Sequence, residues 1–462
     1  RGTSVEELVV GFPNASGGEG QVLVFEISSS KQLVEAVTLQ LPDPLSGDRF
    51  GKSLARLENS SQFGPVDKDD FLVSAPGRRN PTGAVVGLVS LFVPELIPNG
   101  GIALLSSISD VEVNNEFGAD IATHSLNGIT KVYVGAPMDD VINRGTDTGS
   151  VKVLSLSLGG FVLEQNLVGN RAHDQYGFSV DATPGVLAVS AIAAKDQADR
   201  IARGAVYRYR VGAAGIQQYD AHIGELNEHG MRIGYSIALT NDISLDGVPE
   251  TLAGTNADPL STAPLSVKTS RRAKILQQEV GARGHGGFFT LVPMDSQRQD
   301  FDLRTAVAAG DFTGDDIDEA VIVRAGSSGS VEVHMFAGTL LHGRSTGMSM
   351  VAQVSRTGRI YIDVTDAFGS TPFSIVVSDR AVEVPFMFDS VEHLACVDLS
   401  RVTNHSTYVA NFEGDFSLDI PTVYTPPMTL DTANLVFQSV AYDFGTGELR
   451  TSNAITLVLP IQ

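Results

Sequence analysis

Two short marks in residues 117–137 recur along the chain: Phe117-Gly118 and, starting sixteen residues later, Tyr133-Val134-Gly135-Ala136-Pro137. The first mark returns as Phe50-Gly51, Tyr176-Gly177 and Ile233-Gly234. The second is a β-branched run that ends in a Gly-Ala-Pro-like turn, and it returns around residues 11, 74, 190, 254 and 324. With residue 135 included, these positions are spaced by 63, 61, 55, 64 and 70 residues. A β-rich repeat of this length predicts blades or solenoid turns.

Each repeat also contains a third apolar run of alternating character, which follows a turn rich in Gly, Asn, Asp or Pro. Examples are residues 21–27, 86–93, 151–156, 205–210 and 331–336. Such short runs between turn residues are typical of antiparallel strands. A fourth, outer strand is expected in the variable segment that follows each run. Four strands per repeat form the blade of a β-propeller, so the sequence predicts an all-β fold.

The alternation of the two marks resembles the FG-GAP repeat, the blade of the integrin α-subunit propeller and its relatives. The resemblance covers residues 5 to about 340, and it implies a propeller of six or seven blades. The first repeat lacks its Phe-Gly half, so we expect a strand from later in the chain to close the ring. The predicted propeller domain spans residues 1–344.

Residues 345–462 lose both marks but keep about eight predicted strands, the number typical of an immunoglobulin-like β-sandwich. The connector from Gly338 to Gly347 is the predicted linker. An alternative makes residues 359–400 a seventh blade, with a later strand closing the ring onto residues 5–27. The expected sandwich core is Ile362, Phe373, Ile375, Val377, Phe386, Leu394, Cys396, Val409, Leu418, Phe437 and Val440.

Composition limits the possible partners. The chain has 462 residues, a net charge of −22 and a single cysteine, Cys396, so it forms no internal disulfide. The negative charge makes nucleic acids and anionic membrane surfaces poor partners and favours divalent cations. No run of 18 apolar residues occurs, so no membrane-spanning segment is predicted.

Two acidic segments, 242–250 and 311–319, carry the strongest chemical signal. Each places oxygen-bearing side chains at relative positions 1, 3, 5 and 9, with a peptide carbonyl available at position 7. A tightly curled loop of this kind supplies the oxygens that Ca²⁺ prefers. The resemblance implies calcium in the same loops, between the first two strands of a blade. The predicted ligands are Asp242, Ser244, Asp246, Val248, Glu250, Asp311, Thr313, Asp315, Ile317 and Glu319.

Other motifs are few. Asn14, Asn59 and Asn404 each begin an Asn-x-Ser triplet, which is an N-glycosylation acceptor in a eukaryotic secretory protein. No nucleophile elbow, phosphate-binding loop or His/Cys metal motif is present in the sequence. The sequence therefore favours a binding function over catalysis.

We expect an extracellular or cell-surface adhesion, recognition or assembly module, in which calcium braces the loops. Its protein or glycan ligand should bind the propeller face opposite the calcium loops, where the connectors 77–83, 137–149 and 194–204 lie. Asp139, Asp140 and Arg144 are the predicted contact residues of that face. Two alternatives are an enzyme on a propeller scaffold, acting on polysaccharide or a lipid anchor, and a self-assembling subunit of an extracellular filament.

Overall fold

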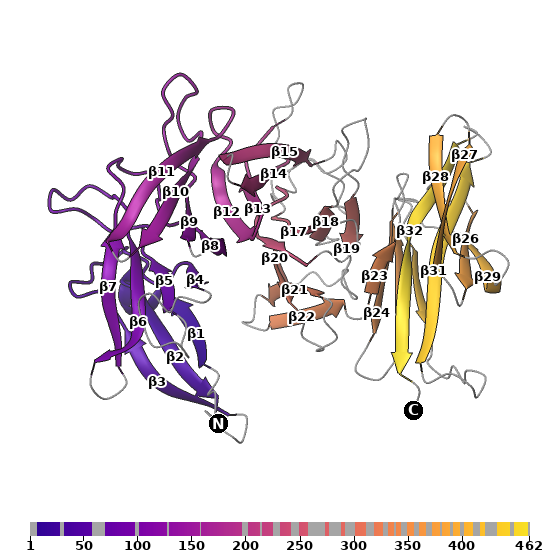
Figure 1. Ribbon diagram of the computed structural model, residues 1–462, viewed down its shortest axis with the longest axis horizontal. Helices are drawn as coiled ribbons and strands as arrows, with labels where there is room; N and C mark the ends of the chain where they lie inside the picture. The colour runs from indigo at the N-terminus through magenta and orange to yellow at the C-terminus, as the bar shows by residue number, and fades with distance from the viewer. Residues whose placement is uncertain are drawn as a thin grey trace. The chain divides into compact units, whose positions relative to one another are not determined.

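The computed structural model describes an almost wholly β protein (Figure 1). Among the described residues, the four-residue α1 (Ala15–Gly18) is the one helix. The described residues are 7–27, 32–57, 70–97, 101–126, 129–157, 159–195, 202–212, 215–224, 232–241, 249–256, 273–276, 288–291, 301–310, 318–326, 331–336, 339–342, 349–354, 360–365, 372–378, 381–388, 391–397, 402–409, 416–420, 432–443 and 448–460.

Six antiparallel sheets follow one another along residues 7–336, one sheet for each repeat. Sheet 1 contains β1 (Glu7–Phe12), β2 (Gln21–Ile27) and β3 (Leu33–Leu39). Sheet 2 contains β4 (Leu54–Leu57), β5 (Asp70–Ser74), β6 (Val89–Ile97) and β7 (Gly101–Ile108). Sheet 3 contains β8 (Ile121–Leu126), β9 (Ile129–Ala136), β10 (Ser150–Ser157) and β11 (Gly160–Val168).

The next three sheets continue the pattern. Sheet 4 contains β12 (Tyr176–Thr183), β13 (Val186–Ala191), β14 (Ala205–Gly212) and β15 (Gly215–Ile223). Sheet 5 contains β16 (Ile237–Leu239), β17 (Thr251–Gly254), β18 (Ala273–Leu276) and β19 (Phe288–Leu291). Sheet 6 contains β20 (Phe301–Gly310), β21 (Glu319–Gly326) and β22 (Val331–Phe336). Sheets 2 to 5 have the four strands predicted for a repeat, and sheet 1 lacks the first strand, as its missing Phe-Gly mark indicates.

The two sequence marks recur because they meet where consecutive sheets touch. A Cβ on Gly135, in the second mark of repeat three, would overlap the carbonyl oxygen of Gly177, in the first mark of repeat four. Gly11 lies in the same way against Gly51. Gly51 and Gly177 also have positive φ values of 84° and 88°, which glycine adopts without steric cost. Close backbone approach therefore selects the glycines of both marks.

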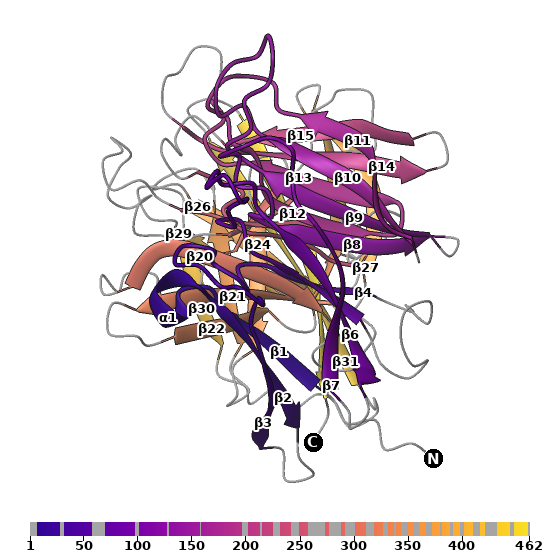
Figure 2. The same ribbon diagram turned by 90° about the vertical axis from the view of Figure 1, so that its left-hand side faces the viewer.

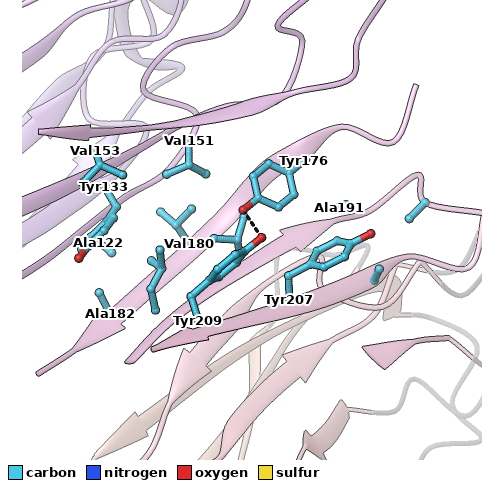
Figure 3. Close-up of a cluster of buried hydrophobic side chains, with 14 residues drawn as sticks. Ala122, Tyr133, Val151, Val153, Tyr176, Val180, Ala182, Ala191, Tyr207 and Tyr209 are labelled. Carbon is cyan, nitrogen blue, oxygen red and sulfur yellow. Dashed lines mark hydrogen bonds between the residues drawn. The ribbon is translucent and has the colours of Figure 1, made fainter. Parts of the chain in front are cut away.

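Apolar side chains fill the space between consecutive sheets. Phe50 and Phe92 of repeat two pack with Val22 and Leu39 of sheet 1 in one cluster. A second cluster joins sheets 2 and 3, and a third joins sheets 3 and 4 (Figure 3). The strands of sheets 3 and 4 lie side by side in Figure 2. Each of these cores lies between neighbouring sheets rather than inside one, which is the packing of repeat architectures.

The chain divides into two compact units, residues 1–237 with 260–262 and residues 238–259 with 263–462. Sheets 1 to 4 belong to the first unit, and the second contains sheet 6, most of sheet 5 and the C-terminal sheets. No closed propeller or barrel is found among the described residues. The ring closure and the domain boundary at residues 344 and 345 stay predictions.

Beyond residue 336 the strands form three further sheets. The largest has the order β23-β32-β31-β26-β29 and consists of Thr339–His342, Glu448–Pro460, Thr432–Asp443, Pro372–Ser378 and Val402–Val409. The second, β24-β25-β30, consists of Ser349–Val354, Ile360–Thr365 and Phe416–Ile420. The third is the pair β27 (Ala381–Phe388) and β28 (Val391–Val397). Because β25 and β26 lie in different sheets, residues 359–400 do not form a seventh blade.

The first two of these sheets share an apolar core. Phe373 of β26 lies 5.2 Å from Phe416 of β30, centroid to centroid, in an edge-on arrangement. Ser439 of β31 donates a hydrogen bond to the sulfur of Met350 in β24. Of the predicted core residues, Ile362, Phe373, Ile375 and Phe437 are buried. The side-chain environments of Phe386, Leu394, Cys396 and Leu418 lie outside the description.

Two predictions for this region are wrong, and two are too strong. The linker predicted from Gly338 to Gly347 contains β23, which pairs with β32. Val409 is 59% exposed, because it ends β29. The prediction for Val440 is too strong, because its side chain is half-buried and alternates along β31 with Ser439 and Ala441, which are buried. The prediction for Val377 is also too strong, because its side chain is half-buried.

Candidate functional site

The two acidic segments occupy equivalent places in consecutive sheets. Residues 242–250 connect β16 to β17, and residues 311–319 connect β20 to β21. Each therefore links the first two strands of its sheet, as predicted. Glu250 and Glu319 are described. Asp242, Ser244, Asp246, Val248, Asp311, Thr313, Asp315 and Ile317 lie outside the described residues.

The first segment begins and ends on a buried pair. The amide of Thr240 donates to the carbonyl of Glu250 at 3.0 Å. The hydroxyl of Thr240 lies 3.5 Å from Oε2 of Glu250. Both residues are 1% exposed. The ends of the segment are thus fixed together, and the carboxylate of Glu250 lies inside the protein.

A second contact joins the two segments, although they are far apart in sequence. The amide of Asn241 donates to Oδ2 of Asp318 at 2.5 Å, and its side-chain amide donates to Oδ1 at 3.0 Å. The amide of Thr305 in β20 also donates to the carbonyl of Thr255, just after β17, at 2.8 Å. The beginning of the first acidic segment therefore lies beside the end of the second, and both belong to the same compact unit.

Calcium itself stays a prediction. Within the described ranges, no group of three His, Cys, Asp or Glu side chains is arranged to hold a metal ion. Eight of the ten predicted ligands lie outside those ranges, so this finding does not bear on the loops. The described geometry adds one detail, because Asp318 accepts hydrogen bonds on both carboxylate oxygens and was not among the predicted ligands.

A buried ion cluster joins the loop between β9 and β10 to the loop after β7. The ammonium of Lys152 lies 3.1 Å from Asp139, 3.6 Å from Asp110 and 3.4 Å from Glu112. The hydroxyl of Ser150 also donates to Asp139. The sequence predicted Asp139 as a contact residue of the binding face, and this is wrong, because its side chain is only 3% exposed. Its role is to bind one loop to β10 and to the loop after β7.

The cluster shifts the pKa values of its members. A hydrogen bond to Asp139 and burial raise the pKa of Glu112 to about 7. Burial alone would raise the pKa of Asp139, but hydrogen bonds to Glu112 and Ser150 and the charge of Lys152 lower it. Burial would lower the pKa of Lys152, and the charges of Asp110 and Asp139 raise it instead.

Other contacts hold the tips of the same loops. Arg144 donates to the carbonyl of Gly169, and Asp140 accepts from the amide of Asp147 at 2.9 Å. Two apolar side chains are left in solvent, Val111 at 93% and Ile142 at 86% exposure. Ordered loops with exposed apolar tips are a suitable surface for a partner.

A polar contact between sheets was not predicted from the sequence. Asp120 accepts from Ser53 Oγ at 2.8 Å and from Ser179 Oγ at 2.8 Å, so one carboxylate joins repeats two, three and four. It also accepts the amides of Ile121 and Val180 at 3.0 Å. Asp120 lies two residues after the glycine of its Phe-Gly mark, and Ser53 and Ser179 occupy the same place in their repeats. Aligning the repeats beyond the glycine would have shown this third mark.

The predicted glycosylation sites fall in different settings. Asn14 is exposed, directly before α1. Asn404 lies within β29, and Asn59 lies outside the described residues. Modification of any of the three stays a prediction.

No family model matches the sequence, and no curated protein matches it. In the part of the chain that the structure describes, no helix is long and apolar enough to span a membrane.

Proposed function

We propose that this protein is a calcium-stabilised recognition module of the cell surface or extracellular space, built on a β-propeller. The observation that carries the proposal is the pairing of the two acidic segments. They link the first two strands of consecutive sheets, and Asn241 and Asp318 join them. Two curled acidic loops in this position would bring many carboxylates together, and a hard cation would offset their mutual repulsion.

The repeated sheets support the propeller part of the proposal. Four consecutive four-stranded antiparallel sheets, with cores between neighbouring sheets where these are described, have the pattern of blades. Calcium would then stabilise the loops and take no part in chemistry.

The recognition part of the proposal is supported by the loop between β9 and β10 and the loop after β7, since a loop that follows a second strand lies at the end of that strand away from the acidic segments. The loops there are held by the Lys152 cluster and by Arg144, and they present Val111 and Ile142 to solvent. A protein or glycan partner of the module would bind this rim. Such a surface exposes apolar contacts at little entropic cost, because its backbone is already ordered.

The calcium proposal is tested by calorimetric unfolding in excess EDTA and in saturating calcium. Calcium at a hundred- to a thousand-fold excess over its Kd should stabilise the fold by about 2.7–4.1 kcal/mol. Asp246→Ala and Asp315→Ala should each remove part of this gain. Asp67→Ala is the matched control, because the equivalent segment of repeat two has Gln62 and Val66 where ligands belong. A melting temperature that does not respond to EDTA would refute the calcium proposal.

The recognition proposal is tested separately, by binding of the protein to glycan and cell-surface protein arrays. Ile142→Asp should abolish the strongest interaction and leave the melting temperature unchanged, because Ile142 is 86% exposed. Loss of binding through Asp246→Ala alone, with Ile142→Asp silent, would place the partner at the acidic segments instead.

A further inference from the structure

The two most exposed large apolar side chains of the described residues lie on the two loops that the ion cluster joins. Val111 is 93% exposed on the loop after β7, residues 109–116, and Ile142 is 86% exposed on the loop between β9 and β10, residues 137–149. Among the other described residues, no large apolar side chain is more than 62% exposed. We call these two loops the rim loops. One exposed apolar residue is ordinary, but two at the tips of joined loops indicate a contact surface.

The ion cluster fixes Val111 in its exposed position. Its neighbours in sequence, Asp110 and Glu112, both reach the ammonium of Lys152, at 3.6 and 3.4 Å. One oxygen of Asp110 accepts the amides of Val111 and Glu112 at 2.7 and 3.3 Å, and the other accepts the side-chain amide of Asn115 at 2.8 Å. The residues on both sides of Val111 are thus held inward, and Val111 itself projects into solvent.

Ile142 lies at the tip of a closed turn. The amide of Val141 donates to the carbonyl of Gly145 at 3.2 Å, and the amide of Gly145 donates back at 3.0 Å. Arg144 ties the same turn to the carbonyl of Gly169. Both apolar tips are therefore held in water by ordered backbone, so binding a partner costs little loop entropy.

The rim loops are acidic. With Lys152 of β10 included, they contain six carboxylates and two cations, a formal charge of −4. The cations are Arg144 and Lys152, and the ammonium-bearing side chain of Lys152 is only 6% exposed. Glu112 is 48% exposed, and Asp140 is exposed beside Ile142. The six carboxylates are those of Asp110, Glu112, Glu116, Asp139, Asp140 and Asp147. This surface attracts a basic partner and repels an acidic one.

The apolar part of this surface is aliphatic. Neither rim loop contains a Phe, Tyr or Trp, and Phe117, which follows the first loop, is 2% exposed. The loops therefore offer no flat aromatic face on which a sugar ring could pack. Valine and isoleucine gain free energy by burying their surface against other apolar side chains, which a protein supplies and a glycan does not.

We propose that the rim loops bind a protein segment in which lysine or arginine side chains stand beside aliphatic ones. The aliphatic side chains of the partner would pack on Val111 and Ile142, and its cations would meet Glu112 and Asp140. This inference rests on the proposed recognition function and names the chemistry of its partner.

The test uses a phage-displayed library of random twelve-residue peptides. The library is selected on the wild-type protein and counter-selected on the double variant Val111→Ser/Ile142→Ser, so that the surviving peptides depend on the rim loops. Survivors should contain more Lys and Arg than Asp and Glu, together with Leu, Ile or Val. The most enriched peptide, synthesised with a fluorophore, should lose about tenfold in affinity between 50 and 500 mM NaCl in anisotropy titrations, because salt screens the charges.

Single variants locate the contact. Val111→Ser and Ile142→Ser should each weaken the peptide at least about tenfold, since each removes a buried aliphatic contact. Glu112→Gln and Asp140→Asn should each weaken it about twofold to fivefold. Val162→Ser is the matched control and should change nothing, because Val162 is 55% exposed on β11, outside the rim loops.

Three results would overturn the inference: no surviving peptide, survivors that are neutral or acidic, or a peptide that binds Val111→Ser and Ile142→Ser as tightly as the wild type. Its failure differs from failure of the proposed function. A glycan found on the arrays and lost through Ile142→Asp would leave recognition at the rim loops standing and would exclude the basic protein partner alone.

Discussion

Replacement of Lys152 by methionine keeps most of the length of the side chain and removes the charge at the centre of the buried ion cluster. The side chains of Lys152, Asp139 and Asp110 are 6%, 3% and 8% exposed, so both carboxylates would stay buried without their cation. Removing one partner of a buried ion pair costs about 3–5 kcal/mol. Glu112 adds little, because it is 48% exposed and solvent screens it. For a unit of this size the melting temperature should fall by roughly 6–20 °C.

Differential scanning calorimetry at pH 7 measures this shift, and Lys131→Met provides the control. Lys131 also pairs with a glutamate, Glu164, but their side chains are 23% and 38% exposed. That substitution should cost less than about 1 kcal/mol. A melting temperature of Lys152→Met within 2 °C of the wild type would show that the cluster does not hold the loops. The inference that these loops form a rigid binding surface would then be wrong.

Further predictions concern the same unit. The raised pKa of Glu112, about 7 against an ordinary 4.5, contributes stability that is complete below about pH 4.5 and is lost as the pH rises to about 7. Glu112→Gln should flatten that part of the pH profile of urea midpoints by up to about 1 kcal/mol, since the side chain is half-exposed. Gly135→Ala should cost about 1–3 kcal/mol in urea unfolding, because its Cβ meets the backbone of Gly177, whereas Gly212→Ala, with open space around it, should change stability by less than about 0.5 kcal/mol. Asp120→Ala should lower the free energy of unfolding by about 2–4 kcal/mol in the same assay, because it leaves donors of three repeats unpaired, and a silent Asp120→Ala would contradict its bridging role.

The sheets were predictable because their cause is local and repeated. The Phe117-Gly118 mark precedes the start of the first strand of its sheet, and the Gly135-Ala136-Pro137 mark falls at the end of the second. The alternation of apolar and polar residues identifies the third strand. In the C-terminal region the sequence predicted about eight strands, but not how they pair. β25 and β26 are neighbours in sequence and lie in different sheets, and no short-range pattern encodes that.

The ion cluster and the link between acidic segments were not predictable from one sequence. Asp139 appears as an acidic loop residue until Lys152 is known to lie beneath it. Asn241 and Asp318 are 77 residues apart, and their contact depends on how sheets 5 and 6 pack. The Asp120 mark was available in the repeat alignment, but its meaning depends on three repeats meeting at one carboxylate.

The backbone hydrogen bond that recurs between consecutive repeats has a mechanical consequence. The backbone of Phe50 donates one hydrogen bond to Glu19, Tyr176 repeats this with Thr148, and Ile233 repeats it with Arg203. A chain pulled from both ends would load these few bonds first and would peel away one sheet at a time. With spacings of 63, 61 and 55 residues, each event would release roughly 20 nm of chain. Sheets 1 to 4 would thus unfold one after another under force. Each unfolding event would lengthen the protein by a similar step and leave the remaining sheets folded.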